Sequence, residues 1–512
     1  MSPFASSDAL RRELRAELDA LRVRIAAIEA ENRALRAQGP PAHPLEPAEV
    51  LALQAENRRL QAELERLRRG KKNSSNSSKP PSADHPHDPK SERDPKTRKQ
   101  DPATERKRGG QPGHPGASRE LLPPGSGQII ISCIPKRCGG CEVDLGPDLD
   151  GPDPAPRREQ VWELPPVQWE VYEYQLHCRT CPQCGERIWG QRPPDAPTGC
   201  LGFRAQAEVG LLTGGAQLSR RAALTLLKER SDLPLSLGKL SSVEDTLRQA
   251  LATAYAEVQA AVAAAPVVYC DETPWRDATG KPWLWTAATP EATLFRIAPQ
   301  RNKEAFANLG LDTPGQIKVT DRYSVYIHSL DRHEHALCWS HLDRDFQSWL
   351  GHDSVAHPIA HWLADETAKL FQHWHAFQAG ECDRTGLAVR MAHVQTAMKG
   401  ALQWGAQSGV AKFQGLCGNL LEVWESLWTF VRVEGVEPTN NRAERAVRPG
   451  VLWRKTSLFS QSERGKEYVE RMLTVKTTLR QHGGNFLEFL TDTLRAVHLG
   501  APPPQLFPAV PA

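Results

Sequence analysis

The chain has 512 residues, of which 24% are charged, and its formal net charge is only +3. This length accommodates two to four domains, and the charge excludes a protein that coats nucleic acid through overall basicity. The first ten residues lack a basic region followed by an apolar core, and the longest apolar stretch, Ala260 to Cys270, is too short to span a bilayer. We therefore expect a protein of a reducing, aqueous compartment with no membrane partner.

Apolar residues recur in steps of three and four in two stretches that are separated by a Pro-rich break at Pro40 to Pro47. They are Leu14, Leu18, Leu21, Ile25, Ile28 and Leu35 in the first stretch and Leu53, Leu60, Leu64 and Leu67 in the second. This spacing is typical of a coiled-coil seam, and Asn32 and Asn57 on the seam would select its register. We predict a coiled coil over residues 8–69 that pairs two chains; a helical hairpin within one chain is the alternative.

Residues 70–119 are almost free of apolar side chains and cannot bury enough surface to fold alone. From Lys71 to Arg108 the segment has 11 Lys and Arg against 6 Asp and Glu. We predict a disordered basic linker; weak contact with phosphate groups and a plain solvated linker are both consistent with this composition.

Seven of the 11 cysteines lie between Cys133 and Cys200. Two C-x2-C pairs, Cys138 with Cys141 and Cys181 with Cys184, have the spacing of a structural zinc site with four thiolate ligands. The intervening VWELPPVQWEVYEYQLH (161–177) is expected to form two strands, giving a zinc-ribbon domain over 120–200. Cys178 forms an overlapping pair with Cys181, and a set of free thiols without metal is the alternative.

Residues 201–264 are expected to be helical, with one helix from Leu218 to Arg230, a break at Leu233 to Leu235 and a second helix from Ser236 toward Ala250. The short polar residues and Lys239 at the start of the second helix fit a DNA-recognition helix. An ordinary helical hairpin fits the same pattern.

The hydrophobic period changes after residue 265. Strand-like runs are predicted at 266–270, 283–287, 293–297, 316–320 and 335–339, with a helix at 302–309 after the third run. This order predicts a ribonuclease H-like α/β core, whose first part covers 265–345 and whose last part covers 433–498. In that order the first and fourth strands are neighbours, so Asp271 and Asp321, which follow them, can meet.

A third carboxylate, Glu444, is expected near the start of a helix that is capped by Thr439 or Asn440. Converging carboxylates are unfavourable without a cation, and Mg²⁺ or Mn²⁺ prefers such oxygen ligands. A pair of these ions activates a nucleophile and stabilises the leaving oxygen in phosphodiester cleavage. Glu272 and Asp277 lie near enough to Asp271 in sequence to compete as ligands.

Four motifs resemble the transposases of the insertion-sequence-sixty-six family. They are CDETPW (270–275), TDRYSVY (320–326), CWSHLDRDF (338–346) and NNRAERAVRP (440–449). The KNSSNSSKPPS linker, the GGQPGHPG run, the paired cysteines and the N-terminal zipper resemble that family too, so the resemblance covers nearly the whole chain.

The resemblance implies a multidomain DNA transposase that cleaves and joins DNA at the ends of an insertion element. Asp271, Asp321 and Glu444 would be its catalytic, Mg²⁺-binding triad, and 346–432 a helical insertion in the core. His341, Arg448 and Lys455 match family positions placed near DNA or the site. The implied partners are terminal-repeat and target DNA, a second copy of the chain and accessory transposition proteins, in a cytoplasmic, nucleoid-associated setting.

The chain departs from the family pattern at two places. Arg322 stands where a small residue is expected, and Asp343 and Asp345 make the third motif more acidic than usual. Two alternatives stay open: a catalytically inactive DNA-binding relative, and a structure-specific nuclease on the same core. The Pro/Ala-rich tail at 499–512 is expected to be disordered from residue 501.

Overall fold

The computed structural model describes residues 120–123, 129–145, 157–275, 277, 280–311, 313–350, 354–456, 460 and 462–507. The predicted coiled coil (8–69) and basic linker (70–119) lie outside the described residues. Both stay predictions.

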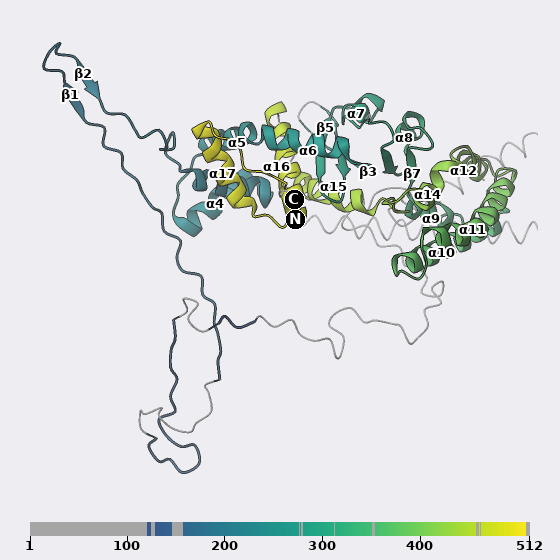
Figure 1. Cartoon of the computed structure of the whole chain (residues 1–512), viewed down its shortest axis with the longest axis horizontal. Coiled ribbons are helices and arrows are strands. Elements are labelled where there is room, and N and C mark those ends of the chain that lie inside the picture. The colour runs from purple at the N-terminus through teal and green to yellow at the C-terminus, as the bar shows by residue number, and fades with distance from the viewer. Residues whose placement is uncertain are drawn as a thin grey trace, which may run out of the picture. The chain divides into compact units, whose positions relative to one another are not determined.

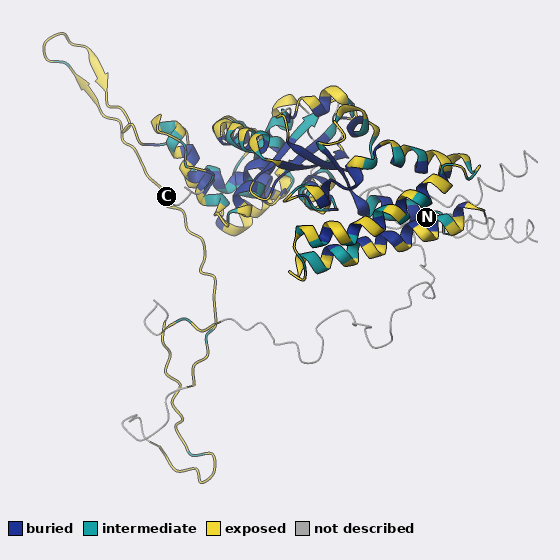
Figure 2. Ribbon diagram, turned by 45° about the vertical axis from the view of Figure 1, so that its right-hand side comes forward, coloured by how far each residue is buried: buried dark blue, intermediate teal, exposed yellow. Residues whose placement is uncertain are grey.

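A five-stranded mixed sheet forms the centre of the α/β core (Figure 2). Its strands are β3 (Val267–Pro274), β4 (Trp283–Ala288), β5 (Thr293–Ala298), β6 (Ile317–Thr320) and β7 (His335–Leu337). The spatial order is β5-β4-β3-β6-β7. β4 pairs antiparallel with both β3 and β5, and β6 and β7 run parallel to β3. The five predicted strands are confirmed, and the topology is consistent with a ribonuclease H-like domain. β3 is longer than expected and continues past Asp271.

The two faces of the sheet are buried in two different hydrophobic clusters, which explains the apolar character of the strands. Along β3, Val268 and Cys270 belong to one cluster, whereas Val267 and Tyr269 belong to the other. This alternation follows from the two-residue period of a strand.

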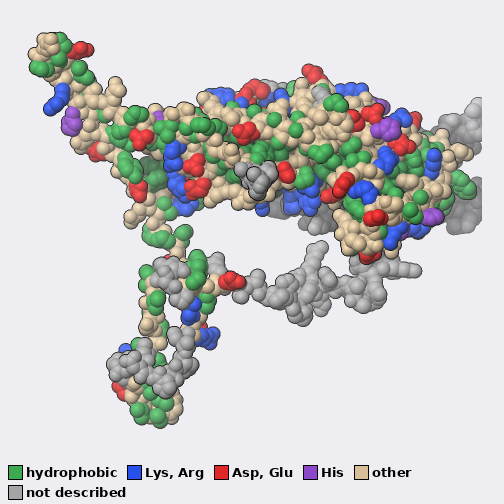
Figure 3. Space-filling view, in the orientation of Figure 1, with side chains coloured by type: hydrophobic (Ala, Val, Ile, Leu, Met, Phe, Trp, Pro, Cys, Tyr) green, Lys and Arg blue, Asp and Glu red, His purple; other side chains and the backbone are tan. Residues whose placement is uncertain are grey.

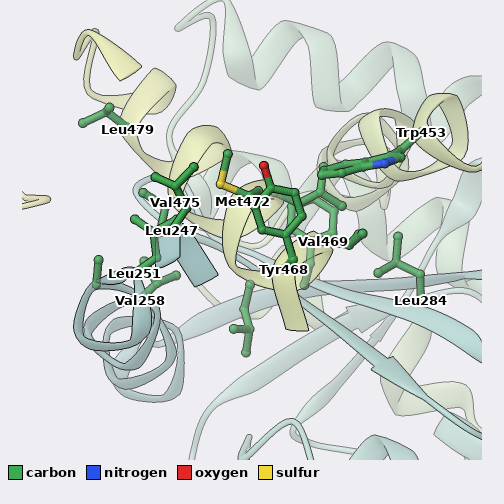
Figure 4. Close-up of a cluster of buried hydrophobic side chains, with 14 of the residues drawn as sticks. Leu247, Leu251, Val258, Leu284, Trp453, Tyr468, Val469, Met472, Val475 and Leu479 are labelled. Carbon is green, nitrogen blue, oxygen red and sulfur yellow. The ribbon is translucent and has the colours of Figure 1, made fainter. Parts of the chain in front are cut away.

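Helices α3 to α6, α16 and α17 share the first cluster with the sheet. Their bounds are α3 (Phe203–Gly210), which runs into a π-helical turn (Leu211–Gly215), α4 (Arg220–Ser231), α5 (Leu237–Ala250), α6 (Ala252–Ala264), α16 (Glu463–Gln481) and α17 (Phe486–Leu499). Figure 4 shows Tyr468, Val469 and Met472 of α16 among these buried side chains. The prediction that 201–264 is helical is confirmed from Phe203 to Ala264.

The second cluster joins the other face of the sheet to the helices of the region 346–432. These are α10 (Ala356–Gln378), α11 (Arg384–Gly405), α12 (Ala411–Glu422), α13 (Trp424–Leu427) and α14 (Thr429–Arg432). The long helices α10 and α11 lie side by side (Figure 1). The region is therefore helical, as predicted, and it lies in the chain between α9 (Trp339–Gln347) and α15 (Asn441–Thr456).

The short helices α7 (Lys303–Ala307) and α8 (Ser324–Ser329) follow β5 and β6. Asn302 caps α7, because its side chain accepts a hydrogen bond from the backbone N–H of Ala305 at 2.9 Å.

The expectation of two strands at 161–177 is wrong. That segment forms no regular structure, and Val161, Leu164 and Tyr172 stay exposed. An alternating pattern forms a strand only where a second strand supplies hydrogen bonds, and none pairs along this segment. A small hairpin forms farther on instead, from β1 (Cys178–Thr180) and β2 (Arg187–Trp189).

The C-terminal tail is more ordered than predicted. Leu506 is buried in the first cluster and the ring of Phe507 contacts His482, so these two residues pack onto the core. Leu506 and Phe507 are the two largest apolar side chains after residue 500, and burying them offsets part of the loss of chain entropy.

Lys and Arg side chains are interspersed with Asp and Glu on the face shown in Figure 3, in keeping with the small net charge. Among the described residues, no helix is long and apolar enough to cross a membrane.

Candidate active site

The parallel strands β3, β6 and β7 bring three polar residues into one row across the sheet. Tyr269 pairs with Val319 and Val319 with Ala336 in the strand register. Two residues farther along the chain stand Asp271, within β3, and Asp321 and Cys338, which directly follow the ends of β6 and β7. Because side chains two apart share a face, all three lie on the face of the second hydrophobic cluster. Sequence reasoning anticipated the two aspartates but missed Cys338; its place near the end of the strand predicted at 335–339 was the available signal.

The same alternation separates Asp271 from its neighbour Glu272. Glu272 lies on the opposite face of the sheet, where it is buried and forms an ion pair with Arg301. It also accepts a hydrogen bond from the hydroxyl of Tyr326. A carboxylate with these two partners is a poor competitor for a metal ion.

The other sequence-level competitor, Asp277, also has a charged partner. Its carboxylate lies 2.6 Å from the ammonium group of Lys466, and both side chains are largely buried. Asp277 therefore has a structural role within the described contacts.

The third carboxylate, that of Glu444, comes from the first turn of α15. The backbone N–H of Glu444 donates to the carbonyl of Asn440 at 3.1 Å. Asn440 is buried, and its side-chain amide donates to the carbonyl of Cys270 at 2.7 Å. Its own backbone N–H donates to Sγ of Cys338 at 3.1 Å. These bonds tie the start of α15 to β3 and to the residue after β7. Oδ1 of Asn440 accepts no hydrogen bond, so this side chain does not cap the helix and instead tethers it to β3.

Burial raises the pKa of all three carboxyl groups, and repulsion from the other carboxylates adds to the rise for Asp271 and Glu444. For Asp271 the largest cause is burial, followed by the negative charges of Glu272, Asp321 and Glu444. Burial also raises the pKa of Asp321. The backbone N–H of Tyr323, which donates to the Asp321 carboxylate at 2.9 Å, lowers that pKa in part. The pKa of Glu444 is raised by burial and by Asp321, and lowered by Arg344. The three groups therefore interact, and a cation would relieve their repulsion.

These carboxylates fit a hard divalent cation, because carboxylate oxygen is the ligand that Mg²⁺ and Mn²⁺ prefer. One oxygen of Glu444 is buried without a hydrogen-bond partner, as expected of a ligand atom. Asp271, Asp321 and Glu444 do not form a group whose ligand atoms all lie within 4.8 Å of one another. The described residues contain such a group in Cys338, His341 and Glu444.

The residues proposed to contact DNA lie in different surroundings. His341, on α9, is largely buried, with Nδ1 3.5 Å from Oε1 of Glu444, and burial lowers its pKa to about 3. Arg448 and Lys455 are exposed on α15, the helix that carries Glu444. Lys239 is half-buried in the first turn of α5.

The four cysteines predicted to bind zinc lie in two separate turns. Cys181 and Cys184 lie at the tip of the β1–β2 hairpin, where the N–H of Cys181 donates to the carbonyl of Glu186 at 2.7 Å. In the other turn the N–H of Gly140 donates to Sγ of Cys138 at 3.4 Å. Hydrogen bonds from neighbouring residues lower the pKa of the thiols of Cys138 and Cys181. The structure does not gather the four sulfur atoms into one group, and zinc binding stays a prediction.

Carboxylates at the ends of neighbouring strands of a mixed sheet, with a third on a later helix, are an arrangement that metal-dependent nucleases and transposases share. Comparison with known families narrows this class. Residues 219–468 match the family described as "Transposase IS66 family", and residues 3–120 match a family of unknown function, DUF6444. Residues 219–468 therefore belong to the IS66 family of transposases.

Two curated relatives are proteins of Sinorhizobium fredii. The uncharacterized protein y4qI is 25% identical over 275 residues, which cover 48% of this chain and 50% of that protein. The uncharacterized protein y4hP is 37% identical over 78 residues, 15% of this chain and 14% of its own length. The chain thus spans half or less of the length of these relatives.

Proposed function

We propose that the protein is a DNA transposase that cleaves and joins DNA strands at the ends of an insertion element. The observation that carries the proposal is the placement of Asp271 and Asp321 in one row on adjacent parallel strands, with Glu444 coupled to both. Membership of the IS66 family supports it.

In this proposal Asp271, Asp321 and Glu444 hold Mg²⁺ or Mn²⁺. Bound ions of this kind activate a nucleophilic oxygen and stabilise the leaving oxygen of a phosphodiester. The protein's own contribution is to hold the three carboxylates in place. The N–H of Tyr323 orients Asp321, the N–H of Glu272 donates to Asp271 at 2.9 Å, and Asn440 fixes the start of α15.

DNA binding is proposed for the exposed face of α15. Arg445, Arg448 and Lys455 are all exposed there, and their spacing of three and seven residues places them on one side of the helix. Cations on the helix of the catalytic Glu444 would bind phosphates flanking the scissile bond. His341 would take part through its position beside Glu444. Lys239 on α5 would contact the DNA at a separate place.

The other parts of the chain are assigned supporting roles. We propose that the predicted coiled coil pairs two chains, which brings two element ends together, and that Cys138, Cys141, Cys181 and Cys184 hold a structural zinc ion. Accessory transposition proteins belong to the same proposal.

The test is metal-dependent nicking of labelled DNA that carries the element's own ends, with Asp271→Asn, Asp321→Asn and Glu444→Gln in parallel. The expected result is cleavage by the parent with Mg²⁺ and at least ~100-fold loss in each variant, on the scale of losing a central catalytic interaction. Glu272→Gln, which changes the adjacent carboxylate on the opposite face, is the matched control and should retain cleavage.

The same experiment separates the two alternatives. An inactive DNA-binding relative would bind the ends without cutting them, even with accessory proteins present. A structure-specific nuclease would cut branched DNA whatever its end sequences.

A further inference from the structure

Cys338 takes the third place in the row that Asp271 and Asp321 begin. Its backbone N–H donates to the carbonyl of Thr320 at 3.0 Å, which holds it beside the residue preceding Asp321. The side chain is buried, and Sγ accepts the hydrogen bond from Asn440. A thiol in this position is adjacent to the carboxylates yet is not itself a ligand that Mg²⁺ prefers.

Next to this thiol, His341 and Glu444 place two buried polar atoms close together without a hydrogen bond. Nδ1 of His341 lies 3.5 Å from Oε1 of Glu444, and both atoms are buried without any hydrogen-bond partner. Unpaired buried polar atoms are costly, so a close pair of them calls for an explanation. The donor atoms of Cys338, His341 and Glu444 all lie within 4.8 Å of one another.

We propose that Cys338, His341 and Glu444 form a binding site for a zinc-class divalent ion, distinct in ligand chemistry from the carboxylate site. Two nitrogen or oxygen ligands of a tetrahedral zinc ion lie about 3.4 Å apart, given bond lengths near 2.1 Å. The distance between His341 and Glu444 fits this arrangement.

The ligand types support the same ion. Thiolate and imidazole are soft or intermediate ligands that select Zn²⁺ or Co²⁺ over Mg²⁺. One thiolate and one carboxylate balance the charge of a divalent cation. Three protein ligands leave a fourth coordination position open. The four-thiolate site predicted at Cys138, Cys141, Cys181 and Cys184 has no such open position.

Glu444 belongs to both ligand sets, which has a functional consequence. An ion held by Cys338, His341 and Glu444 occupies the Glu444 carboxylate and so competes with an ion held by Asp271 and Asp321. Zinc-class ions should therefore inhibit Mg²⁺-dependent nicking, and this consequence rests on the proposed function. The binding site itself does not depend on that function.

The test is titration of Co²⁺ into the metal-stripped, full-length protein, followed by thiolate-to-cobalt absorption and by the number of ions bound. Cys338→Ser and Glu444→Gln are compared with the parent, and Cys417→Ser, which alters another buried thiol on α12, is the matched control. The four N-terminal cysteines are present in every sample, so their contribution cancels in each difference. Circular dichroism verifies that each variant is folded.

The expected result is the loss of one bound Co²⁺ per chain in Cys338→Ser and in Glu444→Gln, with no loss in Cys417→Ser. The thiolate-to-cobalt absorption should decrease because of a lost thiolate ligand only in Cys338→Ser. Unchanged stoichiometry in folded Glu444→Gln, whose carboxylate is partly exposed, would overturn the proposal even if Cys338→Ser failed to fold. If Co²⁺ binds as expected but the parent never cuts DNA, the proposed function fails while this site stands.

Discussion

The guanidinium group of Arg322 lies 2.7 Å from the carboxylate of Asp345, and both side chains are mostly buried. These are two of the positions at which the chain departs from the pattern of the family that it resembles. The departures therefore compensate each other: an added cation beside Asp321 is neutralised by an added anion on α9. The two charges act on the pKa of Asp321 in opposite directions, Arg322 lowering it and Asp345 raising it.

Removing the charge of Asp345 while keeping Arg322 should weaken metal binding. In Asp345→Asn, the unpaired Arg322 is free to attract the carboxylate of Asp321 and competes with the cation. We expect Asp345→Asn to weaken Mn²⁺ binding by about tenfold, equivalent to ~1.4 kcal/mol of altered charge interaction. The double variant Arg322→Gln/Asp345→Asn should restore it. Isothermal titration of Mn²⁺ measures both, and a double variant no better than Asp345→Asn would contradict the compensation.

Neutralising Asp271 and neutralising Glu272 should change the stability of the metal-free protein in opposite directions. Asp271 is buried among like charges, so Asp271→Asn should stabilise the metal-free protein while abolishing Mn²⁺ binding. Glu272 is paired with Arg301 and Tyr326, so Glu272→Gln leaves a largely buried cation unpaired and should cost about 1–3 kcal/mol. Thermal unfolding without metal compares the two. Destabilisation of equal size in both variants would show that the two carboxylates do not differ in this way.

The carboxylate cluster also predicts how stability depends on pH. Asp271, Asp321 and Glu444 have raised pKa values in the fold, so the folded state binds protons more tightly than the unfolded state. The metal-free free energy of unfolding should therefore fall as pH rises above the ordinary carboxyl range, from about pH 4 upward. Metal binding requires ionised carboxylates, so stabilisation by Mn²⁺ should grow over the same range.

Melting curves with and without Mn²⁺, from about pH 5 to about pH 8, test this dependence. Asp271→Asn is the control, because it removes one repelling charge and one ligand. An Mn²⁺-induced shift in Tm that is independent of pH would contradict the assignment of these carboxylates.

Much of the core could be predicted from the sequence, because its strands are short apolar runs and its carboxylates follow two of them. The position of Glu272 on the opposite face could be inferred only once β3 was seen to continue past Asp271, since a chain that turned there would leave both side chains free. Cys338 was missed because its place in the row depends on the pairing of β6 with β7. Strands were wrongly expected at 161–177, where alternation was present but a pairing partner was absent.

The seating of α15 on the sheet gives a final prediction, on stability. At Gly450 an added Cβ would lie 2.2 Å from Cδ2 of Leu284, a fully buried side chain of β4. Gly450→Ala should therefore destabilise the protein by about 1–3 kcal/mol, because overpacking outweighs the gain in helix propensity. Gly415, on the exposed side of α12, has no atom within 4 Å of the same added carbon. Gly415→Ala should stabilise by about 0.5–1 kcal/mol. Denaturant unfolding of the two variants decides the matter: stabilisation by Gly450→Ala would mean that α15 does not pack this closely on β4, and that Glu444 is held less firmly than the structure indicates.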